Sequence, residues 1–101
     1  MPTPKMYVLV RLDLSTQYGF VQGSHALAQL ALDTPTAFQM WGNGTIVYLG
    51  VRCLKELKIW REKLAAGNLC AIPFFEPDLD GQLTAIACYS TGEIFKGLKT
   101  A

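Results

Sequence analysis

The stretch Met6–Leu32, "MYVLVRLDLSTQYGFVQGSHALAQLAL", contains the pattern that decides the fold. It opens on a run of consecutive apolar residues, Met6–Val10, which is typical of a strand buried on both faces. Ser15 or Thr16 can then cap a helix, because a hydroxyl accepts a hydrogen bond from the free N–H groups of the first turn. A buried strand that leads directly into an apolar helix predicts an α/β fold.

The rest of the chain continues to alternate helices with strands. The expected strands are Met6–Val10, Thr45–Val51, Leu69–Phe75 and Leu83–Tyr89. The first expected helix follows the Ser15 or Thr16 cap and runs to about Leu32. A second runs from Thr34-Pro35 to Gly42 or Asn43-Gly44, and a third from Cys53 to Ala66. A short final segment covers Thr91–Phe95. Proline and glycine mark the breaks between them. The order β-α-α-β-α-β-β predicts an α/β fold with a mixed four-stranded sheet flanked by helices.

The size and composition of the chain predict one folded domain over residues 1–101. The chain is 50% hydrophobic, and a domain of 101 residues buries roughly 60–70% of its unfolded surface. Charged residues make up 17% of the sequence, below the usual proportion of about 25%. A surface with so little charge suggests that a partner covers some apolar area. Ile59, which lies off the apolar side of its helix, suggests the same, and we expect the partner to be a second copy of the chain in a homodimer.

Several classes of protein are disfavoured by the same composition. The net charge of +1 gives no general basic surface for nucleic acid, although a local basic patch remains open. Three scattered cysteines and one histidine form no zinc spacing and no disulfide framework, so we expect no metal and no cofactor, and cysteines that act as small apolar fillers. No signal sequence or apolar run of about 20 residues is present, which predicts a cytoplasmic protein that does not enter a membrane.

The first helix is apolar around most of its circumference. A helical wheel places one apolar face at Phe20, Gly23, Leu27, Leu30 and Ala31, and a second apolar edge at Val21, Ala28 and Leu32. A polar line runs along Gln22, His25 and Gln29. We therefore expect the helix to be buried on two sides with one polar seam. Gly23 would let another backbone approach closely.

The polar seam begins close to the start of this helix, and two interpretations of it stay open. Gln22 and His25 either hydrogen-bond to neighbouring loops or belong to a site. The second interpretation is favoured by their position, since the first strand ends at Arg11-Leu-Asp-Leu just before the helix. Ligands of α/β sheets collect at the carboxyl ends of strands, and a helix N-terminus favours a phosphate or a carboxylate.

Two motifs carry a family resemblance that covers most of the chain. The first strand holds Arg11, Asp13 and Leu14 in "VLVRLDL", and the helix holds "QGSHALA" at 22–28. These segments resemble the Arg-x-Asp-Leu and Ala-Ala-Gln-x-Ser-His-Ala motifs of the type 2 peptidyl-tRNA hydrolases. The order of elements agrees as well, and "TAIA" at Thr84–Ala87 resembles the last strand of that family.

The resemblance implies a function and a set of site residues. The family cleaves the ester between a peptide and tRNA without a metal, on a mixed sheet flanked by helices, and often as a homodimer. Its catalytic lysine lies four residues before the glutamine, where this chain has Tyr18, and the connection from Asp13 to Gln22 is about two residues shorter. The acidic position of the family falls in the turn Glu76–Gln82, at either Glu76 or Asp78.

Ester hydrolysis needs an oriented water, a base and donors for the oxyanion. The expected catalytic residues are Gln22, His25, Glu76 and Asp78, and the expected substrate-binding residues are Arg11, Asp13, Tyr18 and Ser24. Glu76 or Asp78 would serve as the base, Gln22 would orient the water, and His25 would relay a proton. The alternative for the acidic residues is a solvated turn. A basic helix face at Lys55, Lys58, Arg61 and Lys63 either touches phosphates or is simply solvated.

Two functions from different classes follow. The first is a peptidyl-tRNA hydrolase-like protein that cleaves the ester between a peptide or aminoacyl group and tRNA. The second is a non-catalytic descendant that binds a nucleotide, RNA or a protein. Tyr18 affects these two functions differently. A phenol is neutral near pH 7 and cannot supply the charge of the family's lysine, but its ring can stack on a base.

Overall fold

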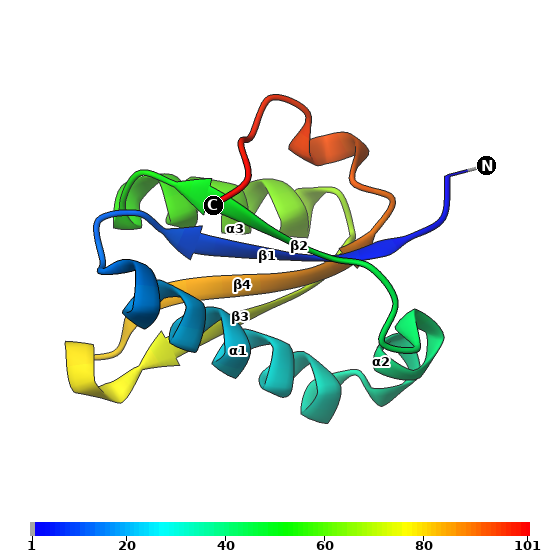
Figure 1. The fold of residues 1–101 in the computed structure, drawn as a ribbon, viewed down its shortest axis with the longest axis horizontal. Coiled ribbons are helices and arrows are strands. Elements are labelled where there is room, and N and C mark those ends of the chain that lie inside the picture. The colour runs from blue at the N-terminus through cyan, green and yellow to red at the C-terminus, as the bar shows by residue number, and fades with distance from the viewer. Residues whose placement is uncertain (1) are drawn as a thin grey trace.

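The computed structural model describes residues 2–101, which form one mixed sheet with helices on both faces (Figure 1). The strands are β1 (Lys5–Arg11), β2 (Ile46–Val51), β3 (Cys70–Glu76) and β4 (Gln82–Ser90). The helices are α1 (Thr16–Asp33), α2 (Pro35–Trp41) and α3 (Leu54–Ala66), with short 3-10 turns η1 (Pro77–Leu79) and η2 (Glu93–Phe95). The predicted α/β class, the four-stranded sheet and the order of elements are confirmed.

The strands lie in the order β2-β1-β4-β3, so the first strand is central. β1 pairs in parallel with β2 and antiparallel with β4, and β3 and β4 form a hairpin through η1. The C-terminal residues cover the outer edge of β2, where Gly50 N donates to Lys99 O at 3.0 Å and Ala101 N donates to Tyr48 O at 2.9 Å. Pro73 lies in the other edge strand, which tolerates a residue without an N–H.

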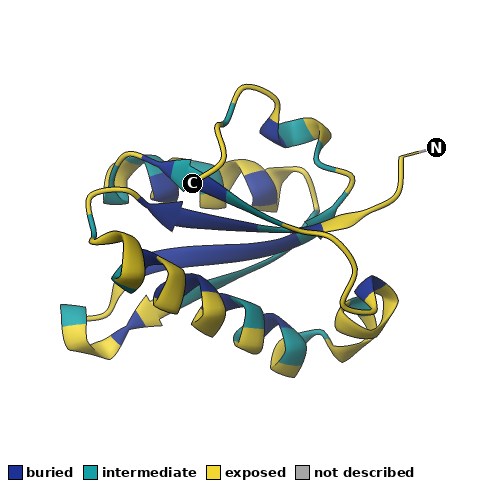
Figure 2. Cartoon of the chain, in the orientation of Figure 1, coloured by how far each residue is buried: buried dark blue, intermediate teal, exposed yellow. Residues whose placement is uncertain are grey.

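Side chains alternate between two apolar cores, one on each face of the sheet. Figure 2 shows that buried residues are concentrated in the inner strands β1 and β4. Met6, Val8 and Val10 of β1 pack with α1 and α2, while Leu9 packs under α3. Cys88 is fully buried in the α3 core, where burial raises the pKa of its thiol to about 11. That cysteine therefore fills space, as predicted from its residue type.

Helix α1 departs from the prediction that two of its sides are buried. Its buried residues lie on one face, at Gly19, Gln22, Gly23, Ala26 and Leu30. Val21 is 50% exposed and Leu32 is 76% exposed, so the second apolar edge faces outward. The expectation is wrong because α1 is an outer layer, and nothing in the described part of the chain packs on its far side. The polar seam is divided accordingly, with Gln22 buried and His25 exposed.

Between residues 2 and 101, no helix combines the length and the apolar character that a membrane crossing requires.

Gly23 sets the distance between α1 and the sheet, which generates a first prediction. A Cβ at Gly23 would lie 2.6 Å from Tyr48 Cε2 and 2.9 Å from Val8 Cγ1, whereas a Cβ at Gly19 would lie at ordinary contact distances, 3.5 Å from Arg11 O and 4.0 Å from Val10 Cβ. We expect Gly23→Ala to destabilise the fold by about 1–3 kcal/mol through overpacking. Gly19→Ala should be neutral or stabilising by up to about 1 kcal/mol, because alanine favours the helix.

Urea unfolding of both variants measures the two free energies of unfolding. Equal stability of the two variants would contradict the close approach at Gly23, since both substitutions add the same methyl group to the same helix.

Candidate functional site

Gln22 joins α1 to both strands of the β3–β4 hairpin. The side chain is fully buried, its Nε2 donates to Glu76 Oε1 at 2.9 Å, and its Oε1 accepts from the Thr84 hydroxyl at 2.6 Å. A buried amide needs such partners, because burying an unpaired polar group destabilises the fold. The fold therefore holds the Gln22 amide in one orientation.

A β-bulge places Thr84 under the helix. Phe74 pairs with Ala85 and Phe75 pairs with Leu83, which leaves Thr84 without a partner in the ladder. A bulge redirects a side chain that regular alternation would send to the other face. The Thr84 hydroxyl can thus reach Gln22 while Ala85 still packs in the α1 core.

Glu76, at the end of β3, is the acidic residue that contacts the helix. Its Oε1 lies 3.5 Å from the Tyr18 hydroxyl, and its Oε2 accepts from the backbone N–H of Asp78 at 3.4 Å. The hydrogen bond from Gln22 lowers the pKa of the Glu76 carboxyl, with further help from the Asp78 N–H, the charge of His25 and the Tyr18 hydroxyl, while burial opposes them. Glu76 is therefore a carboxylate at neutral pH.

Tyr18 lies in the first turn of α1, where its N–H donates to the Ser15 hydroxyl of the N-cap at 3.2 Å. Its phenol is half-buried beside Glu76. Burial and the negative charge of Glu76 raise the pKa of the phenol. Tyr18 consequently stays protonated near neutral pH and can donate one hydrogen bond, but it brings no positive charge.

His25 and Ser24 are arranged differently. The His25 ring is exposed and stacks on Phe74, with 4.7 Å between ring centroids and 10° between planes. Ser24 is also exposed, and its hydroxyl donates to Phe20 O one turn back in the helix at 3.0 Å. His25 therefore lies near Glu76, whose carboxyl pKa its charge helps to lower. The Ser24 hydroxyl is instead bonded within its own helix.

Arg11 and Asp13 form a second group at the end of β1. Arg11 Nη2 and Asp13 Oδ2 are 2.7 Å apart, and Arg11 Nη1 donates to Gln82 Oε1 at 2.9 Å and to Leu83 O at 3.2 Å. The Asp13 hydrogen bond raises the pKa of the guanidinium, and Arg11 in turn lowers the pKa of the carboxyl. Among residues 2–101, no hydrogen bond joins this group to Gln22 or Glu76.

The structure thus brings together part of the predicted set. Tyr18, Gln22 and Glu76 are in contact and His25 lies beside them, whereas Asp78 contributes its backbone and its side chain is exposed. Sequence reasoning missed Thr84, whose only signal was a hydroxyl within a run of buried apolar residues. In the described part of the chain, no three histidine, cysteine or acidic side chains are grouped as metal ligands.

Comparison with known proteins gives the fold and no function. No protein-family model matches the sequence, and no curated protein matches it. Among solved structures, the chain is similar to a protein of unknown function from Agrobacterium tumefaciens, with a TM-score of 0.73 and 12% identity over 100% of this chain and 99% of that one. At this identity the likeness shows a shared fold alone.

The lowered pKa of Glu76 makes stability depend on pH. Because the folded-state pKa lies below the unfolded value, the carboxylate stabilises the fold above the unfolded pKa, and this contribution is lost as the pH falls through the folded pKa. We expect wild-type protein to lose its stability advantage over Glu76→Gln as the pH falls below about 4.5, near the reference pKa of glutamate.

Denaturant unfolding of the two proteins between neutral and acidic pH gives the difference directly. A difference that stays constant down to low pH would show that the charge of Glu76 makes no contribution.

Proposed function

We propose that this chain is a peptidyl-tRNA hydrolase-like protein that acts in the cytoplasm on the ester between a peptide or aminoacyl group and tRNA. The observation that carries the proposal is the contact of Gln22 and Tyr18 with one carboxylate oxygen of Glu76. These positions are the ones that the family resemblance assigns to the glutamine, the lysine and the acidic residue. The free cysteines suit a reducing compartment.

In this proposal, Glu76 is the base and Gln22 is its positioning residue. The carboxylate takes a proton from a water that attacks the ester carbonyl carbon, and the Tyr18 hydroxyl turns from its 3.5 Å contact with Glu76 to donate to the carbonyl oxygen as it becomes negative. The bond from the carbonyl carbon to the ribose oxygen then breaks. His25, exposed beside the site, supplies the proton that this oxygen needs.

Two features make such catalysis slow. A lowered pKa makes Glu76 a weak base near neutral pH, and Tyr18 replaces the positive charge of a lysine with a neutral donor. The Gln22 amide is buried with both ends already bonded, so it holds Glu76 and does not itself meet the substrate.

The same features favour a second candidate, a non-catalytic protein that binds a nucleotide, RNA or protein partner at this site. A buffered peptidyl-tRNA assay under single-turnover conditions, run beside a tRNA-binding assay, separates the two candidates. Release of peptide that depends on Glu76 supports hydrolysis. Retained tRNA binding without release supports the second candidate, and the absence of both would reject tRNA as the ligand.

Tyr18 generates the prediction for activity. We expect wild-type protein to cleave peptidyl-tRNA very slowly or not at all, because the family's charged donor is missing and even a neutral oxyanion donor is worth about 2.7–4 kcal/mol at the transition state. Tyr18→Lys should raise the single-turnover rate by about tenfold or more, since it adds a charged donor beside Glu76.

Gln17→Lys is the matched control, because it adds the same charge at the neighbouring exposed position. An equal gain in both variants would assign the effect to general attraction of tRNA. Fast wild-type turnover that survives Tyr18→Phe, Gln22→Ala and Glu76→Ala would rule out this site.

We also propose a homodimer formed through the outer face of α1 and α2. Val21, Leu32 and Met40 are 50%, 76% and 69% exposed there, although the chain carries little surface charge. Light scattering at tens of micromolar should give twice the chain mass, and Leu32→Glu should give a monomer. Ile59, expected from the sequence to mark the interface, is 43% exposed on α3 across the sheet from α1, so Ile59→Glu is the control and should leave this dimer intact. A wild-type monomer would reject the proposal.

A further inference from the structure

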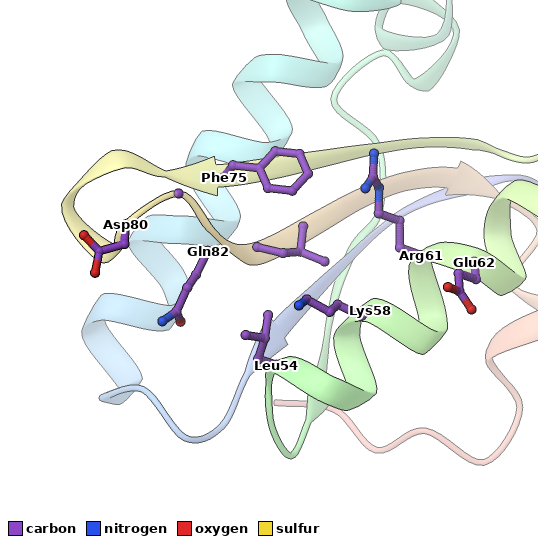
Figure 3. Close-up of a pocket in the computed structure, with 9 residues that line it drawn as sticks. Leu54, Lys58, Arg61, Glu62, Phe75, Asp80 and Gln82 are labelled. Carbon is purple, nitrogen blue, oxygen red and sulfur yellow. The ribbon is translucent and has the colours of Figure 1, made fainter.

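A pocket lies on the other side of the β3–β4 hairpin, between its turn and α3 (Figure 3). Its volume is about 470 Å³, within the range of roughly 300–1,000 Å³ that small-molecule sites occupy. Leu54 and Leu83 supply apolar lining, and Lys58, Arg61 and Gln82 supply hydrogen-bond donors. Phe75 stands at its rim, next to Glu76 in the chain but directed to the opposite face of the sheet.

The cations of this pocket are free to meet a ligand. Lys58 and Arg61 lie one turn apart on α3, and within residues 2–101 neither of them forms an ion pair. Arg61 instead lies over the Phe75 ring, with its Cζ 5.1 Å from the ring centroid. An exposed contact of this kind is weak, so the guanidinium can turn to an anion while another planar group takes the ring face.

The polar groups at the turn add two specific features. Gln82 Oε1 accepts from Arg11, which leaves the Nε2 group of Gln82 to donate to a ligand. Asp80 lines the pocket near Gln82, and in Figure 3 its carboxylate points outward from the turn, away from Lys58 and Arg61. A carboxylate there repels phosphate but accepts hydrogen bonds from ribose hydroxyls. Glu62, the other acidic residue of the lining, lies beyond Arg61 and away from Gln82 in the same view.

Phe75 is 44% exposed on an edge strand that borders the pocket, so one face of its ring is open to a ligand. Aromatic rings in this setting serve as platforms on which nucleobases stack. The pocket thus offers an aromatic ring for a base, two cations without ion-pair partners among the described residues for a phosphate, and a carboxylate for ribose hydroxyls. Together these groups match the three parts of a nucleotide.

We propose that this pocket binds a nucleoside monophosphate. The base stacks on Phe75, the phosphate meets Lys58 and Arg61, and Asp80 accepts from the ribose. The proposal stands apart from ester hydrolysis, because Glu76 faces α1 and no lining residue of the pocket belongs to the Tyr18–Gln22–Glu76 group.

Calorimetric titration with AMP, adenosine and inorganic phosphate tests the proposal. We expect AMP to bind about tenfold or more tightly than either adenosine or phosphate, because only AMP engages both the ring and the cations. Phe75→Ala should weaken AMP and adenosine alike. Lys58→Gln should weaken AMP by about five- to tenfold and leave adenosine unchanged.

Lys55→Gln is the matched control, since Lys55 is exposed on the same helix but does not line the pocket. It should leave the affinity for AMP unchanged. The lysine pair decides the outcome even if Phe75→Ala unfolds, because both lysines are exposed. Failure of the four common nucleoside monophosphates to bind at millimolar concentration, or equal effects of Lys55→Gln and Lys58→Gln, would overturn the proposal.

Discussion

The amide of Gln22 connects α1 to the end of the β3–β4 hairpin, and the arrangement of the whole site depends on it. One side of the amide accepts from Thr84 and the other donates to Glu76, so the helix, the central β4 strand and the edge β3 strand are joined within one side chain. A fully buried amide left without either partner would be destabilising. The buried amide therefore constrains three features together. These are the bulge at Thr84, the end of β3 at Glu76 and the close approach of α1 to the sheet at Gly23.

This constraint also explains why the hairpin end presents two different surfaces. Glu76 is held toward α1, so its neighbour Phe75 must point to the α3 face, where it meets Arg61. Arg11, at the end of β1, holds β4, the other strand of the hairpin, through hydrogen bonds to the Gln82 side chain and to Leu83 O. Two proposed sites of different chemistry thus share a single rigid turn, with a carboxylate on one side and free cations on the other.

The sequence predicts the elements of this fold well because each carries its own periodicity and its own breaks. It does not predict which face of α1 is buried, since Val21 and Leu32 are as apolar as Leu30 and only the position of α1 as an outer layer separates them. Thr84 could not be assigned to the site, because its direction depends on a bulge set by strand register. The choice of Glu76 over Asp78 likewise depends on the residue at which β3 ends.

The replacement of a lysine by Tyr18 changes what the site attracts. A lysine would neutralise the carboxylate of Glu76, whereas a phenol whose pKa is raised adds no positive charge beside it. A carboxylate in this state favours hydroxyl or amino groups and repels phosphates. If a nucleic acid binds, its phosphates are therefore better placed on the α3 side of the hairpin, near Lys58 and Arg61, with a sugar or aminoacyl end at Glu76. The two proposed sites therefore favour ligand groups of different charge, on opposite faces of the same hairpin.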